Sequence, residues 1–163
     1  MNKLLSLFAV SLAAPVAAQS SAYIEQVGSG NEARLTQTFA GTGLNTASIR
    51  QVDGSNDALV TQTGSSNVLA GFADGTANAS APALQYDGSR LVLSQDGTGN
   101  QLYIQQENQG YAEVTQSGAD NLAFVLQTFG FDNKAYINQD GGHVAHVTQS
   151  GSNNVANITQ SGF

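Results

Sequence analysis

The stretch Gln26–Gln37 reads QVGSGNEARLTQ, and its spacing of residues recurs along the chain. Gln116–Gln127 reads QSGADNLAFVLQ, and Gln149–Gln160 reads QSGSNNVANITQ. Glutamine, glycine, asparagine, alanine and a second glutamine keep their places, whereas most residues between them vary. Repetition at a fixed spacing predicts a fold made of stacked copies of one short unit.

A seven-residue frame, Asn-x-Ala-x-(Ile/Val/Leu)-x-Gln, describes the second half of this unit. The frame fits residues 31–37, 45–51, 56–62, 121–127, 133–139 and 154–160, and with one key position changed it fits 100–106, 110–116 and 143–149. Looser matches end at Gln26 and cover 67–73, 79–85 and 89–95, which makes thirteen segments.

The fixed residues of the frame fall at every second place. This period predicts β-strands that carry Asn, Ala, the aliphatic residue and Gln on one face. Short links rich in Gly, Asp, Ser and Asn allow a strand, a tight arc and a strand that returns in a second layer. Two strands then form a coil of about 22 residues, and thirteen strands predict an all-β, two-sheet β-solenoid of roughly six and a half coils.

Stacked coils explain why the amides are fixed. Hairpins in one flat sheet are the rival arrangement, but they would not need the same amide at the same inward place. In a stack each side-chain amide meets its copy in the next coil, and a buried amide without partners costs about 1–3 kcal/mol. The predicted ladder residues are Gln26, Asn31, Gln37, Asn45, Gln51, Asn56, Gln62, Gln95, Asn100, Gln106, Gln116, Asn121, Gln127, Asn133, Gln139, Gln149, Asn154 and Gln160. The predicted core residues are Ala33, Leu35, Ala47, Ile49, Ala58, Val60, Ala123, Val125, Ala135, Ile137, Ala156 and Ile158.

Two regions depart from a uniform pattern. In residues 67–85, Gly71 and Ala73 take the places of the aliphatic residue and the glutamine, and Pro82 would remove a donor from a strand. We therefore expect this coil to be bulged or looped out. Leu122, Phe124 and Leu126 form an outward apolar row, which is either ordinary surface or a lateral contact.

The N-terminus reads MNKLLSLFAVSLAAPVAAQS. A basic residue, an apolar run and a small-residue cleavage site predict a secretory signal peptide over 1–18, which leaves 19–163 as one repeat domain. The apolar run is too short to span a membrane. We therefore expect an exported chain without a membrane-spanning segment after cleavage.

Composition and the sparse titratable residues exclude several functions. Twelve acidic residues against five basic ones argue against nucleic acid or anionic lipid as a partner. His143 and His146 are the two histidines, and on a strand they face opposite sides, which argues against a shared metal. We expect no catalytic site, no metal and no cofactor, and hence no enzyme.

The two ends of the predicted stack carry no obvious cap. Solenoids need polar caps to stay soluble, and natural proteins blunt exposed strand edges. The last segment, NVANITQ, is a full repeat next to the C-terminus. An uncapped stack is a template for another copy, and head-to-tail addition of this kind does not close, so it predicts a fibre.

The pattern Q-x-G-x-x-N-x-A-x-x-x-Q, preceded by S-x5-Q from Ser20 to Gln26, resembles the curlin repeat of bacterial curli subunits. The resemblance implies an extracellular functional amyloid that polymerises at the cell surface for biofilm matrix and adhesion. It also implies an outer-membrane export pore and other curli subunits as partners, besides copies of the chain itself.

The chain differs from the family pattern before its first repeat, and a function other than fibre formation stays open. The chain has almost nothing in place of the Gly-rich segment that addresses the export pore, and its last repeat has no Lys or Arg, which favours a major subunit over a nucleating one. The alternative is a monomeric secreted β-solenoid binder, an adhesin or an ice-binding protein. Thr36, Thr61, Thr115, Thr148 and Thr159 recur before the closing glutamine, but we expect them to fall on both sheets.

Overall fold

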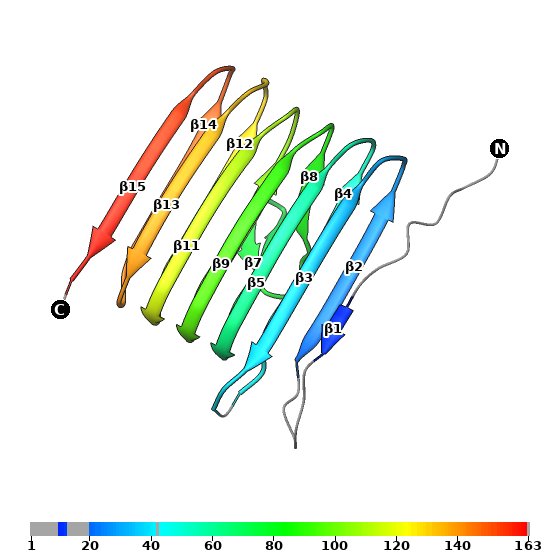
Figure 1. Ribbon diagram of the computed structural model, residues 1–163. Coiled ribbons are helices and arrows are strands. Elements are labelled where there is room, and N and C mark those ends of the chain that lie inside the picture. The colour runs from blue at the N-terminus through cyan, green and yellow to red at the C-terminus, as the bar shows by residue number, and fades with distance from the viewer. Residues whose placement is uncertain (1–9, 13–19, 42, 163) are drawn as a thin grey trace.

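The protein is a stack of β-strand coils with two parallel sheets facing each other (Figure 1). The computed structural model describes residues 10–12, 20–41 and 43–162, so the predicted signal peptide lies outside the described residues except for 10–12. Sheet A contains β1 (Val10–Leu12), β3 (Glu32–Phe39), β5 (Asp57–Ser65), β9 (Arg90–Thr98), β11 (Tyr111–Ala119), β13 (Lys134–Asp140) and β15 (Val155–Ser161).

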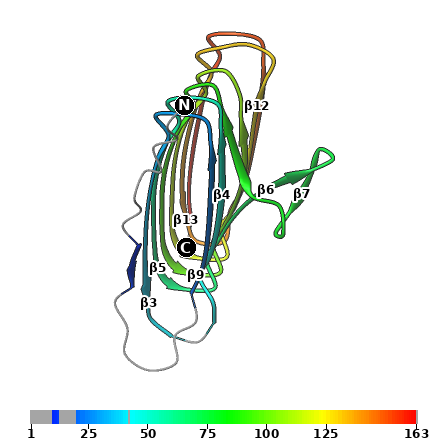
Figure 2. The ribbon, with the colours of Figure 1, turned by 90° about the vertical axis from the view of Figure 1, so that its right-hand side faces the viewer.

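Sheet B lies behind sheet A. It contains β2 (Ser21–Val27), β4 (Thr46–Val52), β6 (Val68–Ala73), β8 (Ala83–Tyr86), β10 (Gln101–Gln106), β12 (Leu122–Thr128) and β14 (Val144–Ser150), with the short β7 (Thr76–Asn78) attached to β6. The chain alternates between the sheets, so one strand of sheet B and the next strand of sheet A form one coil. Viewed along the stack, the coils appear as nested loops (Figure 2).

The register repeats without slippage. Gln37 pairs with Gln62 across β3 and β5, and Gln116 pairs with Gln139 across β11 and β13. Parallel in-register pairing puts each frame position above its copy, as the fixed spacing requires. The predicted all-β, two-sheet β-solenoid is therefore confirmed.

One rung of sheet B is built from two separate strands. β4 pairs with β6 through Ala47 and Leu69 and with β8 through Ile49 and Ala83. Residues 67–73 and 79–85 thus contribute to a single rung instead of two. Apart from the short β1, the described part of the chain holds twelve rungs, or six coils, where thirteen segments had predicted six and a half.

The frame runs through this rung with an insertion. Ala70 pairs with Tyr103 of β10. On the β4 side, Ala47 pairs with Leu69 and Ile49 pairs with Ala83, which leaves Ser48 opposite Ala70. Ala83 therefore takes the place in the rung directly after Ala70. Joining residues 67–70 to 83–85 gives NVLAALQ, which keeps Asn67 and Gln85 in frame and exchanges the sizes of the two core residues. The assignment of Gly71 and Ala73 to frame positions was wrong, whereas the expectation that this coil is looped out is confirmed.

Residues 71–82 form a hairpin outside the stack. β7 pairs antiparallel with the end of β6, from Gly71 opposite Asn78 to Ala73 opposite Thr76. Asp74 and Gly75 at the tip have φ of 49° and 74°, as a two-residue turn of a right-twisted hairpin requires. At the base, the Gly71 amide donates to the Ala81 carbonyl at 2.8 Å. Pro82 therefore removes no donor from the sheet B ladder.

The core is a thin apolar layer between the sheets. Its largest fully buried apolar side chains are Ile49, Leu69, Leu91, Leu93, Leu102 and Ile104, in the middle of the stack. Toward the ends, Ala33, Ala156 and Ile158 pack on the core but stay half-buried because no further coil covers them. The other nine predicted core residues are buried.

Glycines line one column of arcs at the ends of sheet A strands. Gly64, Gly97 and Gly118 pair in register with φ of 103°, 118° and 81°. A Cβ on Gly97 would lie 2.0 Å from the Gly118 carbonyl oxygen. The arcs therefore stack too closely for a side chain at Gly64 and Gly97, whereas β3 carries Phe39 at this place.

Within the described ranges, no helix is long and apolar enough to cross a membrane.

Candidate assembly interface

A ladder of glutamine amides runs along sheet A. In it each Nε2 donates to the Oε1 of the next coil toward the C-terminus. The donor–acceptor distances are 2.7 Å for Gln37 to Gln62, 2.8 Å for Gln62 to Gln95 and for Gln95 to Gln116, and 3.0 Å for Gln116 to Gln139 and for Gln139 to Gln160. All of the bonds point the same way, so the ladder has a direction.

Sheet B carries a second ladder with the same direction. It runs from Gln26 through Gln51, Gln85, Gln106 and Gln127 to Gln149, with distances of 2.6, 3.0, 3.4, 3.1 and 2.7 Å. Gln85 closes the looser match over 79–85 but was not among the predicted ladder residues, because the insertion separates this glutamine from the asparagine that precedes it in the regular frame. Its place in the ladder explains why the split rung still closes on a glutamine.

Apart from Gln26, each ladder glutamine also donates to a backbone carbonyl of the other sheet. Gln62 donates to the Thr46 carbonyl at 3.1 Å, and Gln106 donates to the Arg90 carbonyl at 3.0 Å. A single side chain thus joins neighbouring strands of one sheet and also ties the two sheets together. This double role satisfies both donor hydrogens in a buried site.

Asparagines form two further ladders, and these point in the opposite direction. The backbone amide and Nδ2 of Asn56 both donate to Asn31 Oδ1 at 3.0 Å. The same two groups of Asn121 donate to Asn100 Oδ1 at 3.2 and 2.9 Å. Here the later coil donates to the earlier one, whereas in the glutamine ladders the earlier coil donates to the later one.

The asparagine ladders include three positions beyond the eighteen predicted ladder residues, and for His143 the frame 143–149 already predicts the place of an asparagine. Asn67, which the insertion hides in the same way as Gln85, donates to Asn45 Oδ1 at 3.2 Å. Ser89 takes the asparagine place opposite Asn56, and its backbone amide donates to Asn56 Oδ1 at 2.9 Å. His143 takes this place in the last coil, where its backbone amide donates to Asn121 Oδ1 at 3.2 Å.

All eighteen predicted ladder residues lie on the inward face, and their burial depends on position in the stack. The ladder residues of the middle coils are fully buried, as for Gln95 and Asn100 with 0% exposure. Gln26 in the first coil and Asn154 and Gln160 in the last are only half-buried. The end residues therefore have unused hydrogen-bonding capacity.

The C-terminal end face is formed by the edges of β14 and β15. Gln149 and Gln160 each donate to one backbone carbonyl, at 3.0 and 3.1 Å. Within the described chain each is the last glutamine of its own ladder, so neither has a glutamine of a following coil to which it could donate. Between the edge of β14 and the inward face of β15 lies a groove of ≈ 360 Å³, lined by residues 146–150, 154–156 and 158. This groove has the position that the next sheet B strand would occupy.

The N-terminal end face is formed by β2 and β3. The edge of β3 already pairs with an additional parallel strand, β1, from Val10 opposite Leu35 to Leu12 opposite Gln37. The edge geometry of β3 is thus compatible with one more in-register strand. β2 has a partner on one side, β4, and its other edge is open within the described chain.

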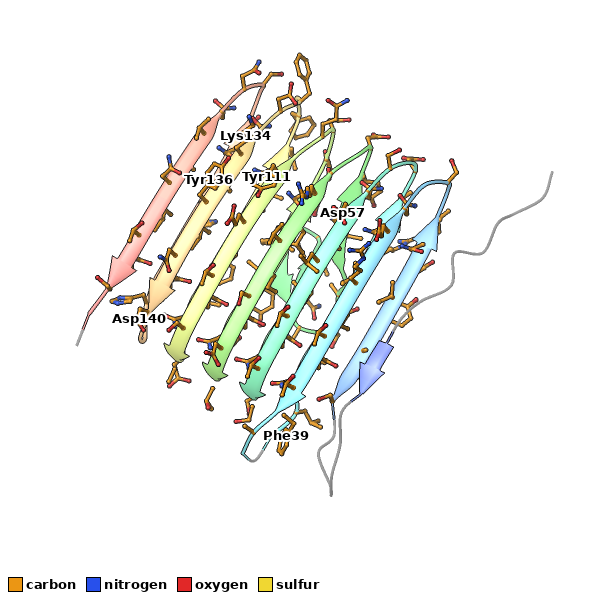
Figure 3. The ribbon with its side chains drawn as sticks, in the orientation of Figure 1. Phe39, Asp57, Tyr111, Lys134, Tyr136 and Asp140 are labelled. Atoms are coloured by element: carbon orange, nitrogen blue, oxygen red, sulfur yellow. The ribbon has the colours of Figure 1, made fainter. Side chains whose placement is uncertain are left out.

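The outer face of sheet A is polar and charged. Arg34 pairs with Glu32, and Arg90 Nε lies 3.2 Å from Asp57 Oδ2. Tyr111 and Tyr136 lie side by side on neighbouring strands, with ring centroids 5.6 Å apart (Figure 3). Burial, together with a hydrogen bond to Glu113, raises the pKa of Tyr111 above its ordinary value.

Four of the five recurrent threonines lie in one column of this face. Thr36 and Thr61 pair in register, and Thr115 and Thr159 continue the column with Ser94 and Asn138 between them. The adjacent outward column contains Asp96 and Asp140. Carboxylates interrupt the flat hydroxyl array that ice binding favours, and Thr148 lies on sheet B as expected.

The comparison with known families agrees with the repeat geometry at one place. Residues 111–141 match the family model of the curlin associated repeat. This segment of the chain carries a curlin associated repeat. It spans β11, β12 and β13, which contribute Gln116 and Gln139 to the sheet A ladder and Gln127 to the sheet B ladder. No curated protein and no solved structure matches the chain.

Proposed function

We propose that the chain is a structural subunit that adds head to tail to copies of itself and forms an extracellular amyloid-type fibre. The observation that carries this proposal is the direction of the ladders. Each end face offers the groups that the other end face lacks, so the ends are complementary to each other and neither is complementary to itself. Such an arrangement does not close and yields an open fibre.

Continuing the register defines the junction in sheet B. β2 of the incoming copy would lie beside β14, with Ile24 opposite Val147 and Gln26 opposite Gln149. Gln149 Nε2 would then donate to Gln26 Oε1, as Gln127 donates to Gln149 at 2.7 Å inside one chain. Ala22 and Ile24 would fill the groove against Ala156 and Ile158.

The junction in sheet A follows the same rule. β3 of the incoming copy would lie beside β15, with Leu35 opposite Ile158 and Gln37 opposite Gln160. Gln160 Nε2 would donate to Gln37 Oε1, and Asn154 Oδ1 would accept from the Asn31 backbone amide. In a full chain the strand must displace β1, which removal of the predicted signal peptide over 1–18 would achieve.

The curlin associated repeat supports the wider role. Its presence favours a curli-type subunit that is secreted, serves biofilm matrix and adhesion, and works with other curli subunits and an outer-membrane export pore. The last repeat has no Lys or Arg, which favours the major, fibre-building type. A structural role also agrees with the chemistry, because the buried glutamine and asparagine amides of the described stack bond to their copies in neighbouring coils.

Dilution of the mature chain from denaturant tests the proposal. We expect fibres whose diffraction has a meridional reflection at about 4.7–4.8 Å, the spacing of hydrogen-bonded strands. A mature chain that folds and remains monomeric for days would contradict the proposal and would favour the monomeric binder, an adhesin or ice-binding protein.

A further inference from the structure

The hairpin of residues 71–82 leaves the stack at a defined place. It departs between Ala70 and Ala83 in the third rung of sheet B and points away from that sheet (Figure 2). Ala70 has an outward position in the rung but is 0% exposed. The hairpin therefore rises from the outer face of sheet B and covers part of it.

The outer face of sheet B beyond the hairpin carries apolar side chains on each of its strands, mixed with the polar Gln101, Gln105, Thr128, His146, Thr148 and Ser150. Tyr103 stacks on Phe124 with ring centroids 5.5 Å apart, and Phe124 meets His146 edge-on at 5.7 Å. The outward side chains of β8, β10, β12 and β14 include no Asp, Glu, Lys or Arg. Their apolar members are Leu84, Tyr86, Tyr103, Leu122, Phe124, Leu126 and Val144. We call this set the sheet B patch.

Sheet A presents the opposite character. Its outward positions carry eight charged side chains, which are Glu32, Arg34, Asp57, Arg90, Asp96, Glu113, Lys134 and Asp140. Charges on an outer face oppose its packing on a second copy, because each would lose its water. On the described strands of sheet B, charged side chains lie outward on β2 and β4, where Arg50 Nε is 3.2 Å from Glu25 Oε2. The strands beyond the hairpin lack this protection.

The size of the hairpin matches the distance that lateral packing requires. Two sheets pack face to face at about 10 Å. Each strand of the hairpin has three paired residues, from Gly71 to Ala73 and from Thr76 to Asn78, and at about 3.3 Å per residue the arm is about 10 Å long. A second sheet at packing distance would collide with an arm of this length.

The arm is held in its shape at its base. At the base, a Cβ on Gly71 would lie 1.9 Å from the Pro82 carbonyl oxygen, so the two strands meet too closely there for a side chain. Asn78 Oδ1 accepts from the Ser80 backbone amide at 2.8 Å and fixes the return to the neck. A rigid hairpin can keep two sheet faces apart, whereas a flexible loop would bend out of the way.

We infer that the hairpin is a spacer that keeps the sheet B patch of one copy from packing on the sheet B patch of a second copy. In the fibre of the proposed function, on which this inference rests, six coils of about 4.8 Å would place one arm every 29 Å or so along the patch. The arm thereby holds fibres apart as single filaments. Without it, the patch of a second copy would pack on this patch, because the apolar side chains of the two copies can bury one another and no outward charge in these strands opposes the contact.

Deletion of residues 71–82 tests this inference. The deletion joins Ala70 to Ala83 and restores the frame as NVLAALQ, so the rung stays in register. A second variant keeps Gly71 and Pro82 and replaces 72–81 by two glycines, which removes the arm without forcing the direct join. We expect fibres of both variants to have at least twice the mass per unit length of the full chain, measured by dark-field electron microscopy.

A matched control removes the patch instead of the arm. In the deletion background, Leu122→Thr, Phe124→Thr and Leu126→Thr should return the mass per unit length to the value of the full chain. Single filaments from both arm-deletion variants, with circular dichroism that shows intact β-structure, would overturn the inference. Bundling that persists in the threonine triple variant would also overturn it, because another face would then be responsible.

Failure of this inference is distinguishable from failure of the proposed function. If the full chain forms no fibres, the proposed function fails, and the spacer is then tested by sedimentation of the folded chains. The deletion variant should sediment as a dimer, and the full chain and the threonine variant as monomers. A monomeric deletion variant would overturn the spacer in that case too.

Discussion

Gln95 in a middle coil and Gln160 in the last coil have the same place in the frame but different surroundings. Gln95 accepts from Gln62, donates to Gln116 and to the Val68 carbonyl, and is 0% exposed. Gln160 accepts from Gln139, donates to the Val144 carbonyl and is half-exposed. The comparison shows that each coil needs a coil on both sides to bury its amides and to satisfy their hydrogen bonds. Middle residues therefore matter for the stability of one chain, and end residues for addition of the next.

The largest effect is expected where coils approach most closely. Gly97→Ala places a Cβ 2.0 Å from the Gly118 carbonyl oxygen at a φ of 118°. Left-handed strain and forced overpacking together should lower the free energy of unfolding by about 3–5 kcal/mol. Urea unfolding of freshly diluted monomer, followed by circular dichroism, measures this loss. A stability within 1 kcal/mol or so of the unmodified chain would show that the arcs are looser than the structure indicates.

A middle-coil amide should come next. Gln95→Leu leaves Gln62 Nε2 without its acceptor and Gln116 Oε1 without its donor, both at 0% exposure. Each orphaned group costs about 1–3 kcal/mol, so we expect a loss of about 2–4 kcal/mol in the same urea experiment. A neutral result would mean that burial of the leucine compensates for the ladder, and the amides would then need another explanation.

The same substitution at the end should act mainly on assembly. Gln160→Leu removes the acceptor of Gln139 at a half-exposed site, which should cost the single chain about 1 kcal/mol. It also removes the donor that the next copy would accept, so we expect the elongation rate from preformed seeds to fall about tenfold, the equivalent of about 1.4 kcal/mol. Seeded growth followed by light scattering measures the rate. Unchanged elongation would contradict the junction.

The smallest effect is expected in the hairpin. Gly75→Ala introduces a Cβ at a φ of 74° with no heavy atom within 4 Å. The strain alone should cost about 1 kcal/mol, and because the tip is outside the stack the elongation rate should not change. A large loss of stability would show that the hairpin is part of the folding unit, and its deletion would then be a poor test of the spacer.

The sequence predicted the fold well because every repeat carries the same residues at the same spacing, so each repeat independently indicates the same strand register. The period of two, the fixed amides and the short turn-rich links each pointed to two facing sheets. The insertion defeated the same reasoning locally, since the frame assumes that consecutive residues stay in one rung. Counting along the chain assigns residues 71–73 to the frame, but in the structure they belong to the hairpin. Asn67 and Gln85 were left out of the predicted ladders as a result.

Other features could not be read from the frame. Leu69 and Ala83 exchange the usual sizes of the two core positions, which is tolerated because the opposite sheet and neighbouring coils set the volume to be filled. The opposite directions of the glutamine and asparagine ladders depend on side-chain rotamers, about which spacing is silent. The contrast between the outer faces emerged only when strand order showed which residues are neighbours.

A disulfide across the proposed junction tests the central claim most directly. The described chain has no cysteine, so any disulfide that forms must come from the introduced cysteines. Thr36→Cys with Thr159→Cys places one thiol in β3 and one in β15, which adjoin only between copies, at the strand spacing of about 4.8 Å that a disulfide can span. The matched control, Thr36→Cys with Thr115→Cys, pairs β3 with a middle strand. After assembly, oxidation and denaturation, we predict a ladder of covalent multimers for the first pair and none for the control. Equal cross-linking of the two pairs, or none in fibres of the first, would contradict head-to-tail assembly in this register.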